Sequence, residues 1–142
     1  MQELDLRFEA ANADQFRENL KNDAEIYIPQ IFWQYTAQKI LTIEWIEGYK
    51  ITALEQIKAA NLNRRTISDN LITCYFNQTY RDGFFHADMH PGNILIMQNG
   101  KIAFVDFGIM GKLSYHDKIY ITQIIYGFVN RDYDYVAEIH HK

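Results

Sequence analysis

The chain has 142 residues, of which 48% are hydrophobic and 15% aromatic, and its formal net charge is −4. This composition is too apolar for a disordered protein, and no run of five basic residues gives the electrostatic footprint of a nucleic-acid-binding protein. The sequence also lacks an apolar run near the ~18 residues of a transmembrane helix, and its acidic start, MQELDLRFEA, is unlike a signal peptide. We therefore expect one soluble, globular unit.

The first predicted element is a helix over residues 3–20. Its apolar residues form two stripes more than a right angle apart: Leu4, Phe8 and Ala11, and Ala13, Phe16 and Leu20. We expect both faces to be covered. Glu9 lies on the second stripe, where a carboxylate needs a cation or a proton. Pairing with Arg7 or Lys21 is the local alternative to a partner elsewhere.

Two β-branched runs follow, EIYIP at 25–29 and KILTIEWIEG at 39–48. Both are predicted strands, and Gly48 at the end of the second suggests a turn. Residues 30–38 are a connection. Because these strands cannot make a satisfactory sheet around the first helix, we expect an upstream segment to be missing.

Helical periodicity returns over residues 52–60 and, more strongly, over residues 64–82. The second helix carries the single cysteine, Cys74, in an apolar series, which excludes an internal disulfide framework and favours a buried thiol in a reducing compartment. Gly83 is predicted to cap this helix at its C-terminus.

The apolar runs NILIM (93–97) and KIAFV (101–105) flank QNG, and Asn-Gly between two such runs predicts a β-hairpin. Ser114 and Asp117 then form the pattern of a helix capping box. The helix that follows has a wide apolar face, made of Ile121, Ile124, Ile125, Phe128 and Val129. A last helix is expected from about Asp132.

The stretch FFHADMHPGNILI, residues 84–96, places two histidines, an aspartate and an asparagine within eight positions. One interpretation is a non-haem iron site with His86, Asp88 and His90 as ligands, because H-x-D supplies two thirds of a facial triad.

Phosphoryl transfer explains more of the pattern. Asn93 follows Asp88 by five residues, and VDFG at 105–108 lies beyond the hairpin. In this chemistry a loop aspartate orients the attacking oxygen, while an asparagine and a D-F-G aspartate bind the Mg²⁺ that accompanies ATP. The hairpin would bring Asn93 close to Asp106. We therefore favour Asp88 as the catalytic residue and Asn93 and Asp106 as metal ligands.

These stretches, with ELDLRFEAAN upstream and PQIFWQYTAQKILTIEWIEG between them, resemble the UbiB/ADCK family of atypical protein-kinase-like proteins, which is associated with ubiquinone biosynthesis. The resemblance implies a partial protein-kinase-like α+β fold, with an N-lobe part in 1–43, a hinge in 44–48 and a C-lobe part in 49–142. It also implies an internal fragment without the lysine of the third N-lobe strand and without the family's K-x-G-Q segment.

The resemblance also implies roles for single residues. Glu9 corresponds to the catalytic glutamate of helix C, which pairs with the absent lysine. The family's E-x-D motif falls on Glu3 and Asp5, which implies a cofactor-binding role for both, and the hinge that contacts the adenine falls on Glu44, Trp45 and Ile46. His86 is expected to brace the backbone around the D-F-G motif.

The implied function of the complete protein is Mg-ATP binding with ATP hydrolysis or phosphoryl transfer in support of ubiquinone biosynthesis, near lipid or quinone-precursor machinery. The implied location is the cytoplasmic side of a bacterial inner membrane, or alternatively the mitochondrial matrix face, with membrane contact through parts outside this chain. Alternatives are a small-molecule phosphotransferase of the aminoglycoside or choline kinase type and a non-catalytic scaffold. A 2-polyprenylphenol hydroxylase, another label within the family, lacks support in these residues. For the 142 residues alone we expect no substantial activity.

Overall fold

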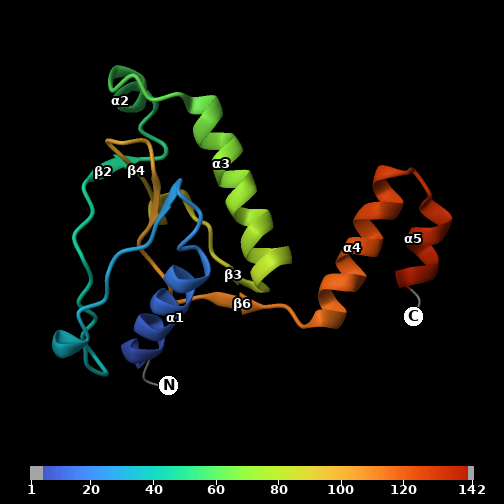
Figure 1. Cartoon of the computed structure of the whole chain (residues 1–142), viewed down its shortest axis with the longest axis horizontal. Helices are drawn as coiled ribbons and strands as arrows, with labels where there is room; N and C mark the ends of the chain where they lie inside the picture. The colour runs from blue at the N-terminus through green and yellow to red at the C-terminus, as the bar shows by residue number, and fades with distance from the viewer. Residues whose placement is uncertain (1–4, 141–142) are drawn as a thin grey trace.

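The computed structural model describes residues 5–140, and the mixed α+β class predicted from the sequence is confirmed (Figure 1). In chain order the elements are α1 (Leu6–Asn19), β1 (Ile26–Tyr27), the 3₁₀ turn η1 (Trp33–Tyr35), β2 (Gly48–Lys50), α2 (Leu54–Ala59), α3 (Arg64–Phe76), the π-helical turn η2 (Asn77–Asp82), β3 (Phe84–His86), the 3₁₀ turn η3 (Pro91–Asn93), β4 (Ile94–Met97), β5 (Ile102–Phe104), β6 (Met110–Lys112), α4 (Tyr115–Val129) and α5 (Tyr133–His140).

Helix α1 is buried along one stripe only. Its N-terminus is capped by Asp5, whose side chain accepts a hydrogen bond from the Arg7 amide. The buried positions are those of the second predicted stripe and its neighbour Ala10, whereas Phe8 is 74% exposed. The prediction that both faces would be covered is therefore wrong within the described residues, which do not include Leu4.

The main sheet has the strand order β1-β5-β4-β2. The predicted hairpin is confirmed as β4 and β5, and β1 adds to β5 in parallel. The Gly100 amide donates to the Met97 carbonyl oxygen, and Gly100 has a φ of 83°. A three-residue loop that ends in a left-handed glycine is a common hairpin connection, so the Asn-Gly signal was read correctly.

The predicted strand over 39–48 is wrong. Residues 31–43 instead fold back on themselves through the isolated bridges Ile31–Ile43 and Ala37–Ile40. A regular strand begins only at Gly48, which pairs with Met97 on β4. A Cβ at Gly48 would lie 2.8 Å from the Ile96 carbonyl oxygen, so glycine permits close strand contact here and does not make the predicted turn.

The predicted helix over 64–82 is α-helical to Phe76 and continues as the π-helical turn η2. The Thr79 hydroxyl donates to the Tyr75 carbonyl oxygen and so competes with the helix's own amide donors. Gly83 ends the turn in the left-handed region, as predicted. Cys74 is buried, also as predicted, and burial raises the pKa of its thiol to about 12.

The core between α1 and the sheet contains an aromatic cluster. The Phe16 ring lies 5.8 Å from Phe104 and 6.2 Å from Phe107, measured between ring centroids. Phe84 and His86 join the same cluster. All five side chains are buried, so the strand that carries His86 and the segment after β5 are fixed against one helix.

Helices α4 and α5 form a hairpin at one end of the molecule, away from the main sheet (Figure 1). The predicted capping box is confirmed at Ser114 and Asp117. Gly127 is buried against α5, and a Cβ there would lie 2.5 Å from Val136. The predicted apolar face of α4 is half-buried at most, and Phe128 and Val129 are exposed. No helix within residues 5–140 is both long and apolar enough to cross a membrane.

Candidate functional site

The β4–β5 hairpin brings Asn93 and Asp106 to the same end of the sheet. Ile94 faces Phe104 across the strands, and the Val105 amide donates to the Asn93 carbonyl oxygen at 3.1 Å. Asn93 also ends the turn η3, where its amide donates to the His90 carbonyl oxygen at 2.9 Å. The two predicted metal ligands therefore flank one hydrogen-bonded strand pair.

His86 links three segments around this end. Its amide donates to Gln78 Oε1 at 2.8 Å, and its Nδ1 accepts from the Asp88 amide at 3.2 Å. Its Nε2 is bonded to the Asp106 carbonyl oxygen. Because Nδ1 accepts and a carbonyl can only accept, the proton is assigned to Nε2. The expected bracing of the D-F-G backbone by His86 is confirmed.

The same bonds bear on the iron-site interpretation. Both ring nitrogens of His86 are engaged by main-chain groups, and His90 Nδ1 accepts from the Gly92 amide at 3.0 Å. Among residues 5–140, no group of three or more histidine, cysteine, aspartate or glutamate side chains lies where it could hold a metal ion. In this geometry His86 serves the loop backbone.

The D-F-G segment combines a buried ring with an exposed carboxylate. Phe107 is fully buried, whereas Asp106 is exposed. Asp106 Oδ1 accepts from the Gly108 amide at 2.9 Å, which closes a local turn. Asp88 is exposed as well, with its amide held by His86. Asp88, Asn93 and Asp106 thus supply carboxylate and amide oxygens, the donors that Mg²⁺ prefers.

Helix α1 reaches this segment through two side chains. Glu9 Oε1 accepts from the Phe107 amide at 3.2 Å, and Asn12 Nδ2 donates to the Phe107 carbonyl oxygen at 3.0 Å. The local alternative for Glu9 is wrong, because Arg7 pairs with Asp5 and Lys21 pairs with Glu18. Sequence reasoning missed Asn12, although its spacing of three from Glu9 places both on one helix face.

Asp5 is engaged at the start of α1. Arg7 Nη2 lies 2.6 Å from Asp5 Oδ2, and hydrogen bonding to Arg7 lowers the pKa of the Asp5 carboxyl. Glu3, the other acidic residue of the E-x-D motif, lies outside the described residues. A cofactor-binding role for Asp5 and Glu3 stays a prediction.

The predicted hinge is hydrogen-bonded to the segment around β1 through Glu44. Both carboxylate oxygens of Glu44 accept from the Tyr27 hydroxyl at 2.8 Å, and this bond raises the pKa of Tyr27. The Glu44 amide donates to the Gln30 carbonyl oxygen at 2.8 Å. It is therefore not free to donate a hydrogen bond to an adenine. Ile46 is buried and Trp45 is 86% exposed. Residues 44–47 and the hairpin turn at 97–99 line a depression of about 400 Å³.

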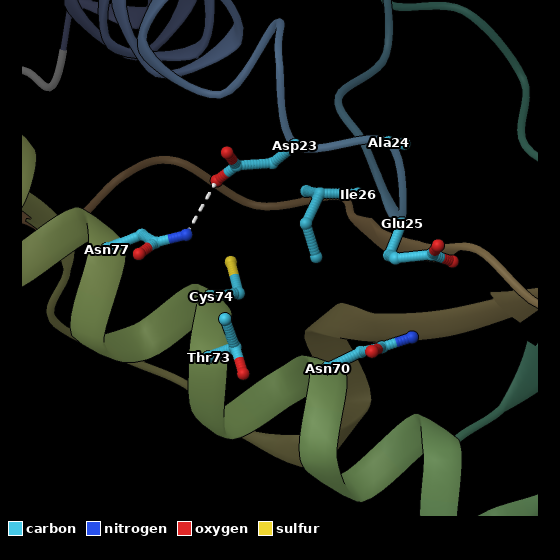
Figure 2. Close-up of a pocket in the computed structure, with 8 residues that line it drawn as sticks. All are labelled: Asp23, Ala24, Glu25, Ile26, Asn70, Thr73, Cys74 and Asn77. Carbon is cyan, nitrogen blue, oxygen red and sulfur yellow. Dashed lines mark hydrogen bonds between the residues drawn. The ribbon is translucent and has the colours of Figure 1, made fainter.

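A smaller cavity of about 120 Å³ lies between the loop after α1 and helix α3 (Figure 2). Cys74 points into it, and Asn77 Nδ2 donates to Asp23 Oδ2 at 3.3 Å across one side. Arg81 Nη1 reaches the same carboxylate at 2.7 Å. The cavity is well below the 300–1,000 Å³ usual for ligand sites, so it is too small for a nucleotide.

Comparisons with known proteins agree on one family. The sequence model described as "ABC1 atypical kinase-like domain" matches residues 1–140. "Probable protein kinase UbiB" of Marinobacter nauticus is 42% identical over 142 residues, which are 97% of this chain and 26% of that protein. "Probable protein kinase UbiB" of Pasteurella multocida is 40% identical, with 97% and 27% covered.

The fold has a solved counterpart. A Mycobacterium tuberculosis structure titled as the Rv3197–erythromycin complex superposes with a TM-score of 0.76 at 26% identity. The match covers 96% of this chain and 34% of that one. The chain therefore spans about a quarter of the length of the curated relatives and about a third of this structure.

Proposed function

The chain belongs to the ABC1 atypical kinase-like family, and its fold is part of a kinase-like α+β domain; from this premise we propose that the complete protein binds Mg-ATP and transfers or hydrolyses its terminal phosphoryl group. The resemblance to UbiB seen in the sequence is confirmed by the relatives of that name. The division into an N-lobe part, a hinge and a C-lobe part stays a prediction.

The observation that carries the proposal is the clustering of oxygen donors around His86. Its imidazole fixes the Asp88 amide on one side and the Asp106 carbonyl on the other. The hairpin hydrogen bond between the Val105 amide and the Asn93 carbonyl oxygen holds Asn93, which supplies the third oxygen ligand, beside the same strand end. The exposed carboxylates of Asp88 and Asp106 therefore stand on a backbone that is held at several points.

In the proposed mechanism Asp88 would orient the attacking hydroxyl or water and accept its proton, and Asn93 and Asp106 would hold Mg²⁺. When bound, Mg²⁺ neutralises charge on the phosphates. The anchored amide of Asp88 limits the motion of its carboxylate, which favours a fixed direction of attack. Glu9, Glu3 and Asp5 are assigned to the phosphate side of the site, and residues 44–46 to the adenine side.

We also propose a wider role for the complete protein in ubiquinone biosynthesis, working with lipid or quinone-precursor machinery at the cytoplasmic face of a bacterial inner membrane. The mitochondrial matrix face is the alternative location. The support for this role is the resemblance to the UbiB/ADCK family and not a contact in the described residues.

The test is calorimetric titration of the complete protein with ATP in the presence of Mg²⁺ and again after chelation. The proposal expects saturable binding that needs the metal. Binding of equal strength with and without Mg²⁺ would contradict the role given to Asn93 and Asp106. A panel of lipid precursors, small hydroxylated molecules and water alone as acceptors then separates a lipid kinase, a small-molecule phosphotransferase and an ATPase.

A further inference from the structure

Helix α1 holds Phe107 by both of its main-chain polar groups. Glu9 Oε1 accepts from its amide at 3.2 Å, and Asn12 Nδ2 donates to its carbonyl oxygen at 3.0 Å. The two side chains are one helical turn apart. They meet the D-F-G segment from the opposite end of the chain, at separations of 98 and 95 residues.

The two bonds act on different peptide planes. The Phe107 amide belongs to the plane shared with Asp106, and the Phe107 carbonyl belongs to the plane shared with Gly108. Because each peptide unit is rigid, holding both planes fixes the two dihedral angles of Phe107. One bond alone would leave the second plane able to rotate.

The other hydrogen bonds of this segment within the described residues do not involve α1. His86 Nε2 holds the Asp106 carbonyl, and the Val105 amide is tied to Asn93. The Gly108 amide, which lies in the plane that Asn12 holds, donates to Asp106 Oδ1 at 2.9 Å. Asn12 therefore acts on the peptide that also orients the Asp106 carboxylate.

We propose that Asn12 is a positioning residue that sets the direction of the Asp106 carboxylate through the Phe107–Gly108 peptide. Its side-chain amide is neutral and keeps its donor at every pH. The metal-binding part of this inference rests on the proposed function, but the positioning of the loop does not.

The alternative is that burial of the Phe107 ring is enough to fix the loop. The ring is fully buried and packs on Phe16 and His86. In that case Asn12 contributes only general stability, and its loss would affect all core amides alike.

The test compares the full chain with Asn12→Leu, which has similar volume and no donor, and Asn12→Gln, which restores an amide. Gln15→Leu is the matched control, because Gln15 is exposed on the same helix and donates only to Asn19 among the contacts of the described residues. Amide hydrogen exchange is measured at Phe107 and Gly108 and, for reference, at Ile102 and Phe104. Mg²⁺ titration in the presence of ATP is the second measurement.

The proposal expects Asn12→Leu to speed exchange at Phe107 and Gly108 by about five- to tenfold relative to the reference amides, the range set by loss of one hydrogen bond. It expects weaker Mg²⁺ binding by a similar factor, partial recovery in Asn12→Gln and no change in Gln15→Leu. Unchanged exchange in Asn12→Leu, or equal acceleration at every amide, would overturn it. If the complete wild-type protein binds no Mg-ATP but the local exchange in this chain changes, the proposed function fails and the positioning role stands. If Asn12→Leu does not fold, Asn12→Ala, which also removes the donor and adds no charge, gives the same comparison.

Discussion

The imidazole of His86 is bonded to the main-chain carbonyl oxygen of Asp106, and the carboxylate of Asp106 is left on the exposed side. The loop is thus fixed by a neutral histidine through its backbone, while the charged group stays available to a ligand. The same ring accepts from the Asp88 amide. One buried side chain therefore fixes the main chain at both of the exposed aspartates on which the proposed chemistry depends.

Replacement of Asp106 tests the metal assignment. Asp106→Asn should weaken Mg-dependent ATP binding by at least about tenfold, because a hard anionic ligand becomes a neutral amide. Calorimetry gives the affinity. Asp69→Asn is the matched control, since Asp69 is exposed on α3 and pairs with Arg65. Equal nucleotide affinity in wild type and Asp106→Asn would remove Asp106 from the metal site.

Metal content tests the iron interpretation. Purified protein should hold no stoichiometric iron, because both ring nitrogens of His86 are engaged by the loop backbone. Elemental analysis of wild type and His90→Ala checks this, with the exposed His116 changed to alanine as the control. One iron per chain that disappears in His90→Ala but persists in His116→Ala would establish the iron site.

Removal of the Gln78 amide should destabilise the fold. Gln78 is fully buried, and its Oε1 accepts from the His86 amide. Gln78→Leu leaves that amide unsatisfied, so the free energy of unfolding should fall by about 1–3 kcal/mol. Gln56→Leu, on the exposed side of α2, should change it by less than about 0.5 kcal/mol. Equal values in urea unfolding would mean that the Gln78 bond carries no net stability.

Arg81 joins the end of α1 to the turn before β3. It pairs with Asp23 and Asp82, whose side chains are 13% and 10% exposed, and it donates to the Asn19 carbonyl oxygen. Arg81→Gln should lower the free energy of unfolding by about 1–2 kcal/mol, because a mostly buried carboxylate loses its cation. Arg65→Gln breaks an exposed pair and should lower it by less than about 0.5 kcal/mol. The reverse order of the two variants in thermal unfolding would refute this difference.

Ionisation of Cys74 should lower the free energy of unfolding at high pH. Burial raises the pKa of its thiol from 9.0 to about 12 in the folded protein, so the folded state holds this proton more tightly. The stabilisation is complete below about pH 9 and is lost as the pH rises toward 12. Between these values wild type should lose stability faster than Cys74→Ala, by up to about 1.4 kcal/mol per pH unit. Parallel curves of unfolding free energy against pH would show that the thiol is not the cause.

Much of the fold could be predicted from local patterns. The hairpin signal at Asn99 and Gly100, the cap at Gly83 and the box at Ser114 and Asp117 all depend on residues close in sequence, and all three are confirmed. The prediction of a strand over 39–48 is wrong because β-branched residues favour extended backbone but do not determine which segment they pair with. Here Ile43 of the segment forms an isolated bridge with Ile31 of the preceding connection.

The candidate site was predictable where its residues follow one another along the chain. Asp88, Asn93 and Asp106 are close in sequence, and one hairpin connects Asn93 with Asp106. Their pattern therefore predicts that the three residues belong to one site. The contacts of Glu9 and Asn12 with Phe107 join residues 98 and 95 positions apart, and no local pattern predicts which main-chain groups a distant helix will meet. Gln78 was missed for a different reason. Its partner His86 is only 8 residues away, but a polar side chain on an apolar stripe does not show how deeply it is buried or which group it bonds.

The pairing of β1 with β5 and the contacts of α1 with Phe107 have a consequence for synthesis on the ribosome. Helix α1 is synthesised well before the partners of its buried face, because Phe104 and Phe107 follow some 90 residues later, a separation like the 95 between Asn12 and Phe107. At about 5–20 residues per second, the nascent chain carries the Phe16 stripe uncovered for roughly 5–20 seconds. During that interval α1 is a natural substrate for chaperones, and ribosomal stalling before residue 104 would leave an aggregation-prone product.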